Sequence, residues 1–330
     1  MNQNVNYTTL ISVDQLRQLR ASGQPLMLFD CSFDLTRPQA GAAMYLEAHI
    51  PGAVYVHLDQ ALSDKTRLAA TAPTGPENEP PDHERPASGG RHPLPSREKF
   101  AKWLGSVGFA NDMQAVVYDR QGANYCGRLW WMLKWAGHEN VAVLDGGLQA
   151  WQMSPPRAGG SESSAADVSA GGINDAATPG ATESGNLPPR APSHFAVKPA
   201  ITQLVTTTTV LNNLGQPIQT LVDARGAPRF RGEVEPLDPV AGHIPGALNR
   251  PFNQNIGADG KFKPAAQLRV EFETLLAGRN PATVVHHCGS GVSAVPNIIA
   301  MELAGLGRTA LYAGSWSEWC SDPSRPVAKG

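Results

Sequence analysis

The sequence predicts an α/β protein made of two copies of one unit, each a mainly parallel sheet flanked by helices. Short apolar runs typical of buried strands alternate with helical segments, as they do where helices connect parallel strands. Several phrases occur twice and in the same order. With 330 residues, 41% of them hydrophobic, the chain is long enough for two domains with a core in each.

The first copy opens with a helix followed by a strand. Ser12 is a suitable N-cap for a helix that begins at the next residue. The apolar run 26–29 then ends at Asp30, which is the pattern of a buried strand. In the second copy, Asp223 ends a similar run. A helix is predicted there for residues 265–276.

The repeats define the unit. The phrase His-Ile-Pro-Gly-Ala at 49–53 returns 194 positions later at 243–247, whereas the strand-like run 115–118 returns 168 positions later at 283–286. The first copy therefore carries extra residues between its phrase and its next strand. Part of this excess is the segment 71–90, which is rich in Pro, Gly and Glu and is predicted to be a surface loop.

Composition also sets the domain boundaries. Residues 154–193 are dominated by Ala, Gly, Ser, Thr and Pro, with almost no large apolar residue, so we predict a flexible linker there. The expected domains are 1–153 and 194–330.

One loop of the second copy carries reactive chemistry. An apolar run ends at Cys288, and glycines 289 and 291 bracket Ser290 before a helical segment begins. Glycines let such a loop curl so that its amides point inward, and the helix adds the positive end of its dipole. A cysteine held there should be partly thiolate and hence nucleophilic. The first copy has Arg120 at the matching position and is expected to be catalytically silent.

The net charge, the spacing of the cysteines and the lack of long apolar runs argue against several other classes of protein. The net charge is −2 and the four cysteines are far apart without a CxxC pair, which argues against nucleic-acid binding, a zinc site and a disulfide framework. No apolar run approaches eighteen residues, and the N-terminus lacks a signal-peptide pattern. We expect a soluble, cytoplasmic protein with no membrane partner, metal or cofactor.

These motifs resemble the rhodanese sulfurtransferase superfamily. The Cys-Gly-Ser-Gly-Val-Ser-Ala loop, the duplicated phrase and the run Gly-Ser-Trp-Ser-Glu-Trp at 314–319 carry the resemblance. The loop is most similar to the 3-mercaptopyruvate sulfurtransferase form. The resemblance implies two rhodanese-like domains, of which the second is catalytic. It also implies that sulfur passes from 3-mercaptopyruvate, through a persulfide on Cys288, to thioredoxin, another thiol or cyanide, with release of pyruvate.

The resemblance also assigns site residues. It implies a proton relay that joins Ser290 to His92 and Asp59, both from the first domain. Substrate binding falls to the following residues: Arg229, Arg231, Gly289, Gly291, Val292 and Ser293. Arg229 should bind the carboxylate of the keto acid. Animal enzymes carry a second substrate arginine where this chain has Leu237, and Arg231 is the expected substitute.

Three alternatives remain open. Thiosulfate is the nearest rival donor, although enzymes that prefer it place cations directly after the cysteine and this chain has Gly289 and Ser290 there. A cysteine phosphatase would need an arginine at the sixth position after Cys288, which is Ala294. A non-catalytic persulfide carrier would be sulfurated without multiple turnover.

Overall fold

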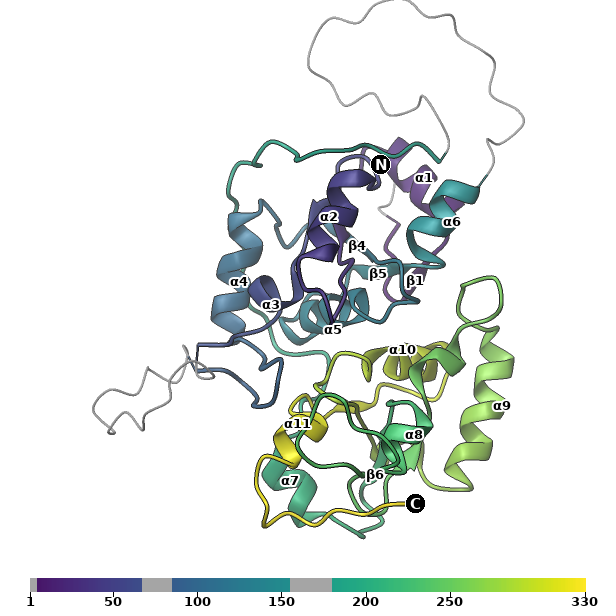
Figure 1. The fold of residues 1–330 in the computed structure, drawn as a ribbon. Coiled ribbons are helices and arrows are strands. Elements are labelled where there is room, and N and C mark those ends of the chain that lie inside the picture. Colours follow the sequence, from purple (N-terminus) through teal and green to yellow (C-terminus); the bar gives the residue numbers. More distant parts are fainter. Residues whose placement is uncertain (1–4, 67–84, 155–179) are drawn as a thin grey trace, which may run out of the picture.

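The computed structural model describes residues 5–66, 85–154 and 180–330. It forms two α/β units, the first in purple to teal and the second in green to yellow in Figure 1. The elements of the first unit are β1 (Leu10–Ile11), α1 (Val13–Ala21), β2 (Leu26–Asp30), α2 (Ala40–Glu47), β3 (Val54–Tyr55), α3 (Leu58–Ala61), α4 (Arg97–Ser106), β4 (Gln114–Tyr118), α5 (Cys126–Trp135), β5 (Val141–Leu144) and α6 (Gly147–Met153). Those of the second unit are α7 (Thr207–Asn212), β6 (Thr220–Asp223), α8 (Ala227–Phe230), β7 (Leu248–Asn249), η3 (Phe252–Asn255), α9 (Ala265–Leu276), η4 (Pro281–Thr283), β8 (Val284–His287), α10 (Val295–Leu303), β9 (Ala310–Leu311) and α11 (Ser315–Trp319).

The two sheets have the same topology. The first has the strand order β1-β5-β4-β2-β3 and the second β7-β6-β8-β9, with parallel neighbours throughout. Asp30 pairs with Tyr118 in the first sheet, and Asp223 pairs with His287 at the corresponding place in the second. Leu204 makes an isolated parallel bridge to β9 where the first unit has β1. The prediction of two parallel α/β units is confirmed.

Local sequence signals explain the first elements. Ser12 caps α1 in a capping box, because its side chain accepts from Gln15 N–H and the Gln15 side chain accepts from Ser12 N–H. All but the first residue of β2 are buried, as expected for a strand covered on both faces of a parallel sheet. Helix α9 spans the predicted residues 265–276.

The repeated histidines support the backbone. His49 Nδ1 lies 2.8 Å from the carbonyl oxygen of Tyr45, and its ring stacks on the Tyr45 ring at 3.9 Å. His243 makes the same pair of contacts with Phe230, at 2.8 Å and 3.8 Å. Because both copies have this arrangement, we infer that these histidines stabilise the fold.

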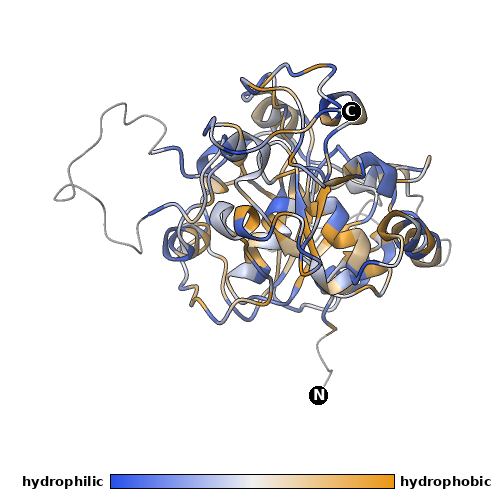
Figure 2. Ribbon diagram, turned by 90° about the horizontal axis from the view of Figure 1, so that it is seen from below, coloured by the Kyte–Doolittle hydropathy of each residue, from blue (hydrophilic) through white to orange (hydrophobic). Residues whose placement is uncertain are grey.

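The two units share one apolar core. Helices α5 and α10 face each other at the junction in Figure 1, and a Cβ on Gly127 would lie 3.3 Å from the Val295 side chain. Buried residues of both helices belong to one cluster, which also includes Cys288. Figure 2 shows the hydrophobic residues gathered on the inner strands and helix faces, with hydrophilic residues mostly outside. Burial of this joint surface fixes the units relative to each other.

The described part of the segment between the units lies along the first unit. Glu183 forms an antiparallel bridge with His49, Ser193 N–H donates to Gly105, and Phe195 is buried in the core. The remainder of the predicted linker, 155–179, is outside the described residues, as are residues 71–84 of the predicted surface loop. No helix in the described ranges is long and apolar enough to cross a membrane.

Candidate active site

The cysteine loop connects β8 to α10. Cys288 directly follows the strand and is 2% exposed. Gly291 has φ +73°, and a Cβ there would lie 2.3 Å from the carbonyl oxygen of Ala313, so only glycine fits. The Cys288 N–H donates to Ser315 Oγ at 3.1 Å, and Ser315 Oγ donates to Tyr312 O at 2.9 Å. The second domain thus holds the cysteine in a fixed loop.

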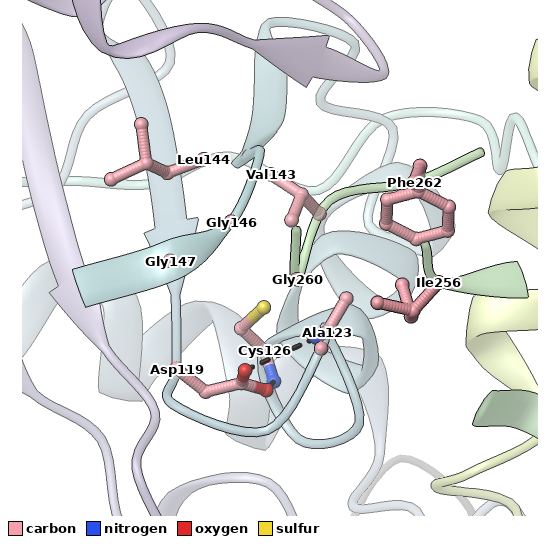
Figure 3. A pocket seen from close by; sticks show the side chains of 11 residues that line it. Asp119, Ala123, Cys126, Val143, Leu144, Gly146, Gly147, Ile256, Gly260 and Phe262 are labelled. Carbon is pink, nitrogen blue, oxygen red and sulfur yellow. Dashed lines mark hydrogen bonds between the residues drawn. The ribbon is translucent and has the colours of Figure 1, made fainter. Parts of the chain in front are cut away.

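The matching loop of the first unit is filled by a carboxylate. Asp119 accepts four backbone N–H groups at 2.8–3.1 Å. These donors are the amides of Gln121, Ala123, Tyr125 and Cys126. Figure 3 shows the carboxylate turned towards Ala123 and Cys126. The cavity beside it has a volume of about 10 Å³, the room of a single water molecule.

The corresponding amides of the second loop lack such an acceptor. The residues that correspond to the four donors are Gly289, Gly291, Ser293 and Ala294. Their N–H groups have no hydrogen-bond acceptor among the described residues, and His287 stands where the first unit has Asp119. Inward amides at the start of a helix attract an anion. The second loop can therefore stabilise negative charge on sulfur, whereas the first already holds an anion of its own.

The predicted relay residues come together across the domain junction. His92 Nδ1 lies 2.7 Å from Ser290 Oγ, and His92 Nε2 lies 3.4 Å from Asp59 Oδ1. Asp59 is further paired with Lys65 at 2.7 Å. This geometry suits the histidine tautomer that accepts the Ser290 hydroxyl proton at Nδ1 and donates to Asp59 from Nε2.

The electrostatics match this arrangement. His92 is 2% exposed, and its burial lowers the pKa of the imidazole despite the opposing effect of Asp59. Burial acts to raise the pKa of Asp59, but the contacts with His92 and Lys65 outweigh it and bring the pKa to about 2. At neutral pH the site therefore holds a neutral histidine beside an ionised aspartate.

A buried arginine connects the relay to the loop. Arg128, on α5, is fully buried and donates to the carbonyl oxygens of Gly291 and His92, both at 3.0 Å. Burial lowers the pKa of its guanidinium to about 10, and a negative charge on Cys288 acts in the opposite direction. Arg128 was not predicted from the sequence as a site residue. The sequence signal that could have indicated it was a charged residue within a strongly apolar helical run.

Two arginines lie beside the residue that follows the cysteine. The position that a Cβ of Gly289 would occupy is 3.0 Å from Arg91 Nη2 and 3.5 Å from Arg229 Nη1. Arg229 was predicted to bind the carboxylate of the donor, whereas Arg91, which comes from the first domain, was not predicted as a site residue. Both arginines contact Asp238, at 2.5 Å and 3.1 Å.

The structure does not bring Arg231 to this cluster. Its guanidinium pairs with Glu233 at 2.6 Å, and both side chains are about half exposed. The reason is local: Arg231 is the C-cap of the short helix α8 and is directed to the surface. Leu237 is also exposed, at 41%. Val292 is buried in the shared core, so its contribution to the site is to fix the loop, and Ser293 completes the turn into α10.

A family model for the rhodanese-like domain matches this chain twice, over residues 12–154 and 206–322. The chain belongs to the rhodanese family. The two matched ranges coincide with the two α/β units, and the second contains the cysteine loop. The rhodanese fold and the duplication expected from the sequence are therefore confirmed.

Relatives with this rhodanese arrangement span the whole chain. A Pseudomonas aeruginosa protein named "Probable 3-mercaptopyruvate sulfurtransferase" is 40% identical over 97% of this chain and 98% of its own length. The Arabidopsis thaliana mitochondrial "Thiosulfate/3-mercaptopyruvate sulfurtransferase 1" is 32% identical over 96% of this chain and 77% of its own. The crystal structure of an Escherichia coli 3-mercaptopyruvate sulfotransferase covers 94% of this chain and all of its own, with a TM-score of 0.66 and 28% identity. This rhodanese-family chain is a sulfurtransferase.

Proposed function

We propose that this sulfurtransferase takes sulfane sulfur from 3-mercaptopyruvate and passes it to a thiol or cyanide through a persulfide on Cys288. The observation that carries the proposal is the row of contacts from Asp59 through His92 to Ser290, two residues after Cys288: His92 is hydrogen-bonded to Ser290 at 2.7 Å and lies 3.4 Å from the Asp59 carboxylate. Cleavage of a carbon–sulfur bond leaves an enolate that must be protonated, and such a relay can move the proton.

The first half-reaction transfers sulfur from mercaptopyruvate to Cys288. The Cys288 thiolate attacks the sulfur of mercaptopyruvate, the new S–S bond forms, and the C–S bond breaks with its electron pair going to carbon. The proton of the mercaptopyruvate thiol passes through Ser290 and His92 to that carbon. The products are the Cys288 persulfide anion and pyruvate. The loop amides, which have no protein acceptor among the described residues, support the proposal because they can bind the anionic sulfur.

The second half-reaction regenerates the cysteine. An acceptor such as the thiolate of thioredoxin, another thiolate or cyanide attacks the terminal sulfur of the persulfide, and Cys288 leaves as a thiolate. All four cysteines of the chain are free and buried. A reducing compartment, the cytoplasm, would keep them so, and we infer that the protein acts there.

Thiosulfate remains the second candidate donor. The sequence argument against it was the absence of a cation directly after Cys288. Arg91 and Arg229, which reach Gly289 from other parts of the chain, weaken that argument because they could bind a sulfonate. The proton relay favours mercaptopyruvate, since sulfite leaves thiosulfate without needing a proton on carbon.

Steady-state kinetics with both donors tests the proposal. We expect kcat/KM for mercaptopyruvate, measured as pyruvate formed with cyanide or a dithiol as acceptor, to exceed that for thiosulfate by at least about tenfold. A clear preference for thiosulfate would reverse the assignment of the donor. Sulfuration of Cys288 without multiple turnover with either donor would instead indicate a persulfide carrier.

The pH dependence should follow His92. Because burial lowers the pKa of His92 below the ordinary 6.5, the neutral form that accepts from Ser290 persists to more acidic pH. We expect kcat with mercaptopyruvate to fall on acidification with a midpoint below 6.5. In Asp59→Asn the midpoint should move further to acid, because the anion that raises the pKa of His92 is gone. A midpoint above 6.5, or one unchanged in Asp59→Asn, would contradict this assignment.

A further inference from the structure

Arg128 is a cation enclosed in the shared core. It lies on α5, which packs against α10 of the second unit, and it is fully buried. Its Nη1 donates to the carbonyl oxygen of Gly291 and its Nη2 to that of His92. Its Nε is also buried and has no hydrogen-bond partner. No carboxylate pairs with this guanidinium among the described residues.

A buried guanidinium is unfavourable unless a negative charge lies near it. The carbonyl oxygens of Gly291 and His92 satisfy N–H groups, but they do not neutralise the positive charge. Burial lowers the pKa of Arg128 to about 10, and the opposing effect comes from a negative charge on Cys288. Because this pKa is still well above 7, the positive charge persists inside the core at neutral pH.

The other guanidinium groups around the cysteine are already paired with carboxylates. Arg225 forms ion pairs with Asp223 at 2.7 Å and with Glu235 at 3.3 Å. Both arginines beside the next residue of the loop contact Asp238. Their charges are therefore balanced within the second unit and its junction, whereas that of Arg128 is not.

The histidines near the loop add no positive charge at neutral pH. Burial lowers the pKa of His92, and Arg128 acts in the same direction to a smaller extent. Burial also lowers the pKa of His287, the residue directly before Cys288. Both imidazoles are neutral at pH 7, so they cannot balance a charge on the cysteine sulfur.

A second buried cation on the same helix shows the contrasting case. Lys134 is fully buried, like Arg128, and it also reaches from the first unit to the second. Its partner is the Glu302 carboxylate of α10, at 2.8 Å. The junction thus supplies a carboxylate to Lys134, whereas Arg128 faces the loop that carries Cys288.

We propose that Arg128 is the counter-ion of Cys288, supplied by the first domain. Its charge stabilises the thiolate before sulfur transfer and the persulfide anion after it. Its bonds to Gly291 and His92 fix the loop relative to the relay. Because Arg128 is fully buried behind the loop, it is a positioning residue that does not contact the donor. The inference rests on the proposed role of Cys288 as nucleophile, but not on the choice of donor.

The pH dependence of alkylation at Cys288 tests the proposal without a donor. The thiolate displaces iodide from iodoacetamide and the thiol does not, so the rate at which mass spectrometry finds this peptide modified reports the thiolate fraction. Arg128→Met removes the charge and keeps an unbranched side chain. We expect it to move the midpoint of the rate upward by about one pH unit or more. Arg128→Lys keeps the charge and should leave the midpoint near that of wild-type protein.

The matched control is Lys134→Met, which removes the other buried cation of α5. It should lower the melting temperature, because Glu302 loses its partner, and it should leave the alkylation midpoint unchanged. The proposal is overturned if Arg128→Met does not move the midpoint or if Lys134→Met moves it equally. A shift in Arg128→Lys as large as in Arg128→Met would also overturn it, since the hydrogen bonds and not the charge would then be responsible.

Wild-type protein gives a second measurement that holds even if Arg128→Met does not fold. Iodoacetate and iodoacetamide attach groups of nearly equal size to Cys288, the first negatively charged and the second neutral. With Arg128 in place, the protein carrying the charged group at Cys288 alone should melt about 2 °C or more higher than the protein carrying the neutral one. An equal or lower melting temperature would contradict the counter-ion.

These measurements separate the inference from the proposed function, because neither needs turnover. If wild-type protein turns over neither donor but the alkylation midpoint depends on Arg128, the reaction assignment fails and the counter-ion stands. If the protein transfers sulfur from mercaptopyruvate but the midpoint does not depend on Arg128, the counter-ion fails and the reaction assignment stands.

Discussion

Cys288→Ser should abolish sulfur transfer from either donor, with kcat reduced by roughly 10⁴-fold or more, the scale seen when a catalytic nucleophile is removed. A serine hydroxyl at this position is not ionised at neutral pH and cannot form a persulfide. The loop should keep its shape, because Gly291 and the bond from residue 288 N–H to Ser315 do not depend on the sulfur. Activity is measured as pyruvate or thiocyanate formed.

Mass spectrometry gives the direct readout of this prediction. After incubation with mercaptopyruvate and no acceptor, the peptide that contains Cys288 should gain the mass of one sulfur atom, and the serine variant should gain none. Cys126→Ser is the matched control, since Cys126 lies in the corresponding region of the first copy and is fully buried. Wild-type activity in Cys288→Ser, or sulfur found on another cysteine, would contradict the single reactive centre.

His92→Ala should lower kcat with mercaptopyruvate by about 10²- to 10⁴-fold, the usual contribution of a general acid–base group. The same variant should lose much less activity with thiosulfate, because sulfite departs without protonation of carbon. The ratio of the two losses is the informative quantity. It separates a role in proton transfer from a role in shaping the loop.

The controls for His92 use one neighbour and one distant histidine. Ser290→Ala removes the hydroxyl group that is hydrogen-bonded to His92. It should also lower kcat with mercaptopyruvate more than kcat with thiosulfate. His194→Ala changes an exposed histidine and should have no effect on either donor. Equal losses with both donors in His92→Ala would show that the histidine only supports the fold.

The duplication and the strand–loop–helix around Cys288 could be predicted from the sequence, and the assignment of the reactive cysteine to the second copy stays a prediction. Each depends on residues that are neighbours along the chain: an apolar run, a cysteine and two glycines. Only a mainly parallel sheet was expected in each unit, and the strand order and register came from the structure. The relay was also predicted, although only through the family resemblance, since 198 positions separate His92 from Ser290.

The surroundings of the cysteine were decided by the tertiary structure. The sequence suggested Arg231 as the second donor-binding arginine because it is close to Arg229 in the chain, yet Arg231 pairs with Glu233 at the surface. Arg91 reaches Gly289 instead, because hydrogen bonds to Ser317 and Glu318 bring its loop across the domain junction.

The same distinction applies to the loop of the first copy. The sequence by itself determined that this copy lacks the nucleophile, since Arg120 stands opposite Cys288. Only the structure shows that the Asp119 carboxylate fills its loop and that the corresponding amides beside Cys288 have no hydrogen-bond acceptor among the described residues. The physical reason is that a sequence specifies local conformation and burial pattern, whereas charge placement around a site depends on side chains that packing brings together from distant segments.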